Sequence, residues 1–152
     1  MTEKNWNDGK SEKKLISLLV PCYNEEAGLR EFYRQTSQVI DQITDYDFQF
    51  LFVNDGSRDH TLAIMRELRE KDSRVSYVNL SRNFGKEIAM IAGMDYLTGD
   101  AAIIMDADLQ DPPELIPEMI SWWEKGYQDV SAKRRSRAGE TFFKKWSSHA
   151  FY

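Results

Sequence analysis

Apolar residues in this chain gather into short continuous runs that alternate with longer segments of mixed character. The runs at 15–20, 48–53, 75–80 and 101–105 have the length and continuity of buried β-strands. The segments at 25–43, after Asp59, at 85–97 and at 113–125 repeat apolar residues at helical spacing. This alternation predicts an α/β domain with a mostly parallel sheet, flanking helices and right-handed crossovers. Segment 85–97 is apolar on most of its surface, so its helix is expected to be buried against the sheet.

The two ends of the chain depart from this pattern. Residues 1–14 are mostly charged and polar, and we expect them to form a flexible leader ahead of one domain at 15–152. Residues 130–133 are a candidate short strand, and a helical pattern runs from residue 140 to the last residue. Because that pattern is still running where the chain stops, we expect the domain to be truncated at its C-terminus.

Composition narrows the possible function classes. The chain has 152 residues, enough for one domain, and its net charge of -5 argues against a general nucleic-acid binder. Its single cysteine, Cys22, cannot form an internal disulfide, which fits a reducing compartment and the role of a small buried residue. No apolar run approaches the ~18 residues of a membrane span, and the N-terminus has no signal-peptide pattern. We therefore expect this part of the protein to be soluble.

A polar motif follows each of the four predicted strands. The motifs are Pro21-Cys22-Tyr23-Asn24-Glu25-Glu26, Asn54-Asp55-Gly56-Ser57, Ser81-Arg82-Asn83-Phe84-Gly85-Lys86 and Asp106-Ala107-Asp108-Leu109-Gln110-Asp111. Because ligands of such sheets bind beyond the carboxyl ends of the strands, the motifs indicate one site on that rim. Asp106 and Asp108 can both reach one divalent cation, Mg²⁺ or Mn²⁺, whose shell substrate phosphates usually complete.

Other phosphate-binding classes fit the sequence poorly. The chain has no G-x-G-x-x-G after the first strand, which argues against a dinucleotide site, and no G-x-x-x-x-G-K-[ST] phosphate loop. A phosphohydrolase with an aspartyl nucleophile also uses Asp-x-Asp. Its motif is expected after the first strand, whereas here it follows the fourth.

The four motifs, in this order and at this spacing, resemble those of the inverting family 2 glycosyltransferases. The matching pieces are 20–26, 53–59, 82–87 and 106–114, and the resemblance covers about residues 15–137. Gln110 in the pattern Asp-x-Asp-x-Gln is most similar to the branch that transfers sugars to polyprenyl phosphates. The resemblance implies the N-terminal part of a GT-A fold, which is Rossmann-like, and a membrane-associated hexosyltransferase of the cell envelope.

The resemblance also implies roles for matching residues. Residues that would line the nucleoside pocket of a UDP- or GDP-sugar donor are Pro21, Tyr23 and Glu25 or Glu26. Asp55 would hydrogen-bond the base. Asp106, Asp108 and Gln110 would hold Mg²⁺ or Mn²⁺ and the ribose and diphosphate of the donor. Lys86 would face the donor phosphates or the acceptor, although a solvated helix start is the alternative for Lys86 and Arg82.

A basic stretch lies near the C-terminal end of the chain. It contains Lys133, Arg134, Arg135 and Arg137, and the aromatic residues Phe142, Phe143 and Trp146 follow it. Arginine matches the geometry of phosphate oxygens, so we expect Arg134 and Arg135 to contact an anionic acceptor. The resemblance implies that basic residues here lie near the diphosphate as well as the acceptor. The stretch could also rest on an anionic membrane surface, or form only a solvated loop and helix face.

The function predicted from the sequence is an inverting, metal-dependent transfer of a sugar from a nucleotide-sugar to a polyprenyl phosphate. In the full-length protein it would take place at the cytoplasmic face of the membrane. No aspartate follows residue 140 to act as the general base that a hydroxyl acceptor needs. A phosphate acceptor needs none, but a fragment that stops before the base would look the same. A transferase with a hydroxyl acceptor and an inactive donor-binding module therefore both stay open, as do the sugar and the base.

Overall fold

The structure is a computed structural model that describes residues 13–132. Its elements alternate along the chain as the apolar runs predict. They are β1 (Lys14–Cys22), α1 (Leu29–Ile40), β2 (Tyr46–Asn54), α2 (Thr61–Lys71), β3 (Val75–Asn79), α3 (Lys86–Met94), β4 (Ala101–Ile104), the 3₁₀ turn η1 (Pro113–Leu115) and α4 (Ile116–Glu124). The described residues divide into two compact units between Glu118 and Met119, and the first unit contains the sheet.

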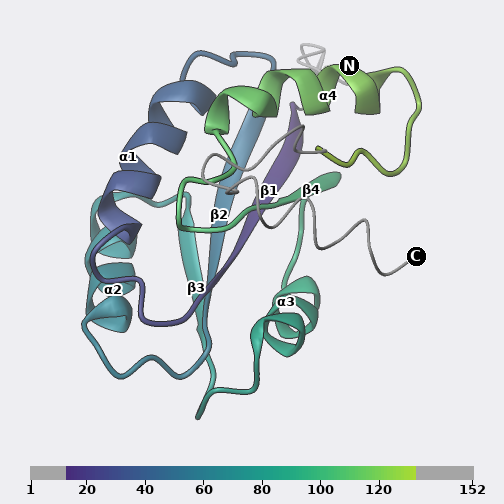
Figure 1. The fold of residues 1–152 in the computed structure, drawn as a ribbon. Helices are drawn as coiled ribbons and strands as arrows, with labels where there is room; N and C mark the ends of the chain where they lie inside the picture. The colour runs from purple at the N-terminus through teal and green to yellow at the C-terminus, as the bar shows by residue number, and fades with distance from the viewer. Residues whose placement is uncertain (1–12, 133–152) are drawn as a thin grey trace, which may run out of the picture. The chain divides into compact units, whose positions relative to one another are not determined.

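The four strands form one parallel sheet in the order β3-β2-β1-β4 (Figure 1). The first three strands are laid down side by side from the centre outward. The chain then returns across the sheet, so that β4 pairs with the free edge of β1. The strand order therefore reverses between β1 and β4, and the carboxyl ends of these two strands meet at the reversal. In open α/β sheets this is the point at which ligands bind.

Helices α1 and α2 cover one face of the sheet and α3 covers the other (Figure 1). Strand β2 explains this arrangement, because its side chains alternate between the two faces. Phe50 is turned toward α1, with 5.2 Å between its ring centroid and that of Tyr33. Leu51 and Val53 lie on the opposite face in a buried cluster with Ala89 of α3. The predicted α/β class with a parallel sheet is thus confirmed.

Helix α3 lies against the sheet as predicted, but only one of its faces is buried. Only its small residues Ala89 and Gly93 are buried, and a Cβ on Gly93 would come within 2.4 Å of Leu19 Cδ1. Small residues therefore let this face approach the sheet closely. Its larger residues Ile88 and Ile91 are 48% and 58% exposed, because only one face of the helix contacts the sheet and these two residues lie outside that contact.

The segments predicted at the two ends of the chain lie only partly within the described residues. Residues 130–132 do not form the expected strand, since a strand needs a paired neighbour and these three residues have none in the described part of the chain. The rest of that candidate strand, Lys133, and the helix expected from residue 140 lie outside the described residues. The leader expected at 1–14 also lies outside them, except for residue 13 and for Lys14, which begins β1.

Candidate active site

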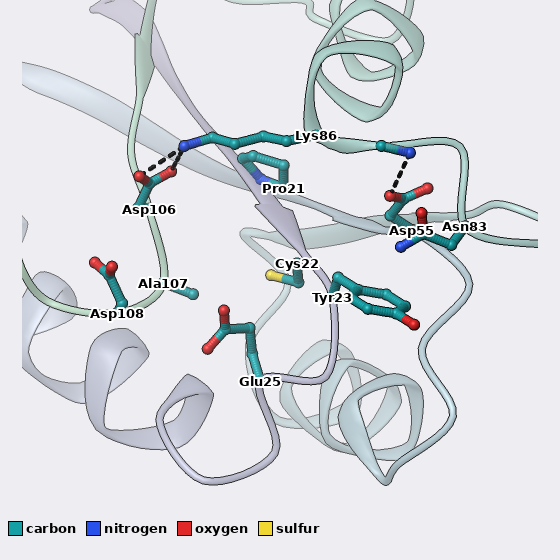
Figure 2. A pocket seen from close by; sticks show the side chains of 11 residues that line it. Pro21, Cys22, Tyr23, Glu25, Asp55, Asn83, Lys86, Asp106, Ala107 and Asp108 are labelled. Carbon is teal, nitrogen blue, oxygen red and sulfur yellow. Dashed lines mark hydrogen bonds and ion pairs between the residues drawn. The ribbon is translucent and has the colours of Figure 1, made fainter.

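A pocket of about 320 Å³ opens where the sheet order reverses (Figure 2). Its walls come from four loops that lie far apart in the sequence. The lining residues are Pro21, Cys22, Tyr23, Glu25, Asp55, Asn83, Gly85, Lys86, Asp106, Ala107 and Asp108. Every strand end that carries a polar motif therefore supplies part of one site, as the sequence predicts.

The loop after β1 is fastened to the loop after β2 by backbone and side-chain hydrogen bonds. Asn24 has a positive φ of 54°, and its side-chain Oδ1 accepts from the backbone N–H of Arg58 at 2.8 Å. The backbone N–H of Asn24 donates to Ser57 Oγ at 2.9 Å, and that of Glu25 donates to Thr61 Oγ1 at 2.8 Å. Asparagine tolerates this left-handed conformation better than most residues do. These contacts hold Tyr23 and Glu25 in the wall of the pocket.

Asp55 fastens the third loop. Its side chain is buried, and its two carboxylate oxygens accept from the backbone N–H groups of Phe84 at 2.7 Å and Gly85 at 2.9 Å. Gly56 lies directly beneath the same loop, since a Cβ there would be only 2.3 Å from the carbonyl carbon of Arg82. Because Gly56 also has a φ of 64°, the close approach requires glycine at this position.

The third loop delivers Lys86 to the fourth. Lys86 is the first residue of α3, and its ammonium lies 2.5 Å from Asp106 Oδ1 and 2.7 Å from Oδ2. Figure 2 shows the lysine stem extending across the pocket from the start of α3 to Asp106. Asp108 lies two residues further along the same loop, and its Oδ1 accepts from the backbone N–H of Gln110 at 3.0 Å.

Negative charge accumulates on one side of the pocket. Burial raises the pKa of the Glu25 carboxyl, and the neighbouring carboxylates of Asp108 and Asp106 raise it further. Burial also raises the pKa of the Cys22 thiol, with Glu25 and Asp106 adding to the effect. Cys22 is therefore a protonated, buried thiol beside the pocket, in agreement with its expected packing role.

The carboxylates suit a hard divalent cation that is shared with a ligand. Within residues 13–132, no group of three or more histidine, cysteine, aspartate or glutamate side chains is arranged to hold a metal ion. Asp106 and Asp108 supply oxygen ligands from one short loop, and the Glu25 carboxylate raises the negative potential beside them. Mg²⁺ and Mn²⁺ are often bound in this way, by one or two carboxylates and by the phosphates of a substrate. The residues present therefore fit such an ion.

Most of the residues expected at the site do line the pocket, and the exceptions are informative. Glu26 points elsewhere, because its Oε2 accepts from the backbone N–H of His60 at 2.9 Å and lies 2.8 Å from the ring Nδ1. Gln110 is not among the lining residues either, and its backbone contacts Asp108. The expected phosphate-binding residues Arg134 and Arg135 lie outside the described residues.

Sequence reasoning missed several residues that shape the site. Asn83 and Gly85 line the pocket. Both belong to a motif that the sequence singles out, but no role was predicted for either residue. Thr61 was also missed, because its hydroxyl accepts from the backbone N–H of Glu25, a residue distant in the sequence that no local pattern pairs with it. No helix among residues 13–132 combines the length and the apolar character needed to cross a membrane.

Comparison with known proteins agrees with the resemblance of the motifs. The family model described as glycosyl transferase family 2 matches residues 17–152. An uncharacterized glycosyltransferase of Bacillus subtilis, YkcC, is 52% identical over 136 residues, which are 90% of this chain and 42% of that protein. A bactoprenol glucosyl transferase of Shigella phage SfX is 42% identical over 137 residues, 90% of this chain and 45% of that protein. The chain thus spans less than half the length of these relatives.

Solved structures share the fold. The mannosyltransferase PcManGT of Pyrobaculum calidifontis, in complex with GDP-Man and Mn²⁺, has a TM-score of 0.60 at 22% identity, over 74% of this chain and 33% of that chain. Glucosyl-3-phosphoglycerate synthase of Mycobacterium tuberculosis, in complex with Mn²⁺, UDP and phosphoglyceric acid, has a TM-score of 0.53 at 25% identity, over 71% of this chain and 38% of that chain. With the family match, these likenesses give the conclusion that the chain belongs to glycosyl transferase family 2 and has the GT-A fold.

Proposed function

We propose that this chain forms the donor-binding part of an inverting, metal-dependent glycosyltransferase that moves a sugar from a UDP- or GDP-sugar to a polyprenyl phosphate. The observation that carries the proposal is the juxtaposition of Asp106, Asp108, Glu25 and Lys86 with the ring of Tyr23 in one pocket. A nucleotide-sugar has a planar base, a diphosphate and a sugar. The pocket offers an aromatic ring, carboxylates for a bridging cation, and an ammonium group.

The nucleoside of the donor is held by groups from two strand ends, those of β1 and β2. Tyr23 is 42% exposed, and its ring is available to the base. Pro21 and Glu25 line the remainder of the nucleoside side. Each carboxylate oxygen has a second lone pair, so Asp55 can accept from the base while it holds the backbone of Phe84 and Gly85.

The diphosphate lies beside Asp106 and Asp108 in this proposal. Mg²⁺ or Mn²⁺, when bound there, stabilises the negative charge that develops on the leaving nucleoside diphosphate. Asp106 and Asp108 hold and orient that ion, and Lys86 contributes a positive charge on the same side. Use of a metal and of these nucleotides is supported by two structural neighbours, one crystallised with Mn²⁺ and GDP-Man and the other with Mn²⁺ and UDP.

The proposed acceptor is supported by relatives that are named bactoprenol glucosyl transferase or its homolog. A polyprenyl phosphate is already an anion at neutral pH, so transfer requires no general base. Its phosphate oxygen forms the new bond to the anomeric carbon from the side opposite the leaving group. The bond from that carbon to the diphosphate oxygen breaks, and the electron pair leaves with the nucleoside diphosphate. The configuration is inverted, and Arg134 and Arg135 are the proposed partners of the acceptor phosphate.

A transfer assay on the full-length protein tests this function. UDP-glucose or GDP-mannose is supplied with Mn²⁺ and undecaprenyl phosphate in detergent, and the lipid-linked sugar and its anomeric configuration are measured. We expect one donor to give a product of inverted configuration. Asp108→Ala should reduce turnover by about a hundredfold or more, because charge stabilisation of the leaving group is lost.

The matched control is Asp95→Ala, an exposed aspartate at the far end of α3, which should leave turnover unchanged. Wild-type turnover in Asp108→Ala, or a product of retained configuration, would contradict the proposal.

A further inference from the structure

Lys86 occupies the atoms of Asp106 that a metal ion would need. Its ammonium contacts both carboxylate oxygens, at 2.5 Å and 2.7 Å. A divalent cation held by Asp106 would bind through the same carboxylate group. The ammonium and the cation would then lie within a few ångströms of each other, where like charges repel strongly. Lys86 and a metal therefore compete for Asp106.

The charges of the pocket explain why Asp106 takes a lysine partner here. Glu25, Asp106 and Asp108 carry three carboxylates, and among the described lining residues Lys86 supplies the positive charge. Asp55 does not draw on that charge, because its oxygens accept from the backbone at Phe84 and Gly85. An ammonium on Asp106 thus reduces the repulsion among the three carboxylates when no other cation is bound.

Lys86 can move its charge while its backbone stays fixed. The loop that leads to it is held by Asp55 and is packed over Gly56. The lysine side chain is 55% exposed and has a flexible stem of four carbons, so its ammonium can swing to a new partner. A donor phosphate beside Asp106 is such a partner, since it brings negative charge to the place where the ammonium must leave the carboxylate.

We propose that Lys86 is a stand-in cation, which neutralises Asp106 in the empty site and transfers to a phosphate of the nucleotide when the metal takes its place. This inference rests on the proposed function for the identity of the ligand. Lys86 is then a residue that raises the affinity for the metal–nucleotide complex and lowers the affinity for the metal alone. No purely structural role gives effects of opposite sign.

The test measures both affinities in Lys86→Met, which removes the charge and keeps a stem of similar shape. Free Mn²⁺ is followed by electron paramagnetic resonance without nucleotide, and UDP and GDP are titrated calorimetrically in saturating Mn²⁺. We expect Mn²⁺ alone to bind about fivefold more tightly to Lys86→Met than to wild type, since a competing charge is gone. We expect the nucleotide to bind about tenfold more weakly, since a charged partner of its phosphate is lost.

Controls separate charge from structure. Lys86→Arg keeps the charge and should stay close to wild type in Mn²⁺ binding, and Lys86→Gln provides a second neutral variant if Lys86→Met folds poorly by circular dichroism. Lys71→Met removes a lysine at the C-terminal end of α2, where its partner is Glu67, and should change neither affinity.

The outcomes distinguish the inference from the function on which it rests. Unchanged or weaker Mn²⁺ binding in the neutral variants would overturn the stand-in role. If the wild-type protein still binds Mn²⁺ and nucleotide in that case, the proposed function stands. Absence of nucleotide binding by the wild type in Mn²⁺ would contradict the proposed function and the inference together.

Discussion

Asp55 shows how one side chain can build a site that it also lines. The resemblance to family 2 enzymes implies a contact between this carboxylate and the base. In the structure its two oxygens accept from the backbone at Phe84 and Gly85, and the side chain is buried. A buried carboxylate is costly unless hydrogen bonds compensate for the water that it loses, and these two N–H groups provide that compensation. Asp55 therefore positions the loop that carries Lys86.

Asp55→Ala should release that loop. We expect the amide protons of Phe84 and Gly85 to lose their protection in hydrogen exchange followed by NMR, because their acceptor is removed. We also expect the free energy of unfolding to fall by about 2–4 kcal/mol, from the loss of two hydrogen bonds to a charged group. Asp95→Ala serves as the control, and unchanged exchange at residues 84 and 85 in Asp55→Ala would refute the positioning role.

At the scale of single residues, the sequence predicts which positions are polar strand ends but not where each side chain points. Glu25 and Glu26 are neighbours with the same chemistry, and the sequence offers no reason to choose between them. The positive φ of Asn24 turns the chain so that Glu25 lines the pocket and Glu26 meets His60. That choice depends on hydrogen bonds to the loop at 57–61, which is more than 30 residues away in the sequence.

At the scale of elements, a polar cluster joins the end of α2 to the start of β3 and to α1. Asp72, which follows α2, accepts from the hydroxyl of Tyr33 at 2.7 Å and from Arg74 Nη2 at 2.9 Å. Arg74 Nη1 donates to Asp41, just after α1, at 2.7 Å. Burial opposes ionisation of Asp72, but the hydrogen bonds from Arg74 and Tyr33 outweigh it and hold the pKa of this carboxyl below its ordinary value.

This cluster should make stability depend on pH in a defined direction. Because the pKa of Asp72 is lower in the folded state, its ionised form stabilises the fold above the unfolded value of about 3.9, and this contribution is lost as the pH falls through the folded value. We expect Asp72→Asn to cost about 1 kcal/mol at pH 7 in urea denaturation. The difference from wild type should shrink as the pH falls below about 4.

Asp47→Asn, at an exposed position near the start of β2, is the control for that experiment. A difference between wild type and Asp72→Asn that stays constant or grows toward acid would contradict the assignment.

The strands could be predicted because a parallel strand that is covered on both faces is a continuous apolar run. Their extra length could not, since the structure extends β2 to Tyr46 and to the polar residue Asn54 through backbone pairing. Helix α3 shows the converse limit. Its apolar character predicted a helix buried against the sheet, but Ile88 and Ile91 are about half exposed, and Ala89 and Gly93 make the contact with the sheet.

At the scale of the whole molecule, the site is a product of strand order. Alternating strands and helices predict that all four polar motifs share one rim, but not which of them are neighbours. The order β3-β2-β1-β4 sets the end of β1 beside the end of β4, and so brings Glu25 to Asp106 and Asp108. No local pattern encodes this adjacency, because it depends on the chain returning to the free edge of β1 after β3.

The same adjacency defines the central claim, which is a nucleotide site completed by a metal ion. Calorimetric titration of UDP and of GDP into the protein, with and without Mn²⁺, measures it directly, and Asp108→Asn is compared with wild type. We expect one of the two nucleotides to bind, its binding to require Mn²⁺, and Asp108→Asn to weaken that binding by about tenfold or more. Failure of both nucleotides to bind in Mn²⁺, or binding that ignores both the metal and Asp108, would contradict it.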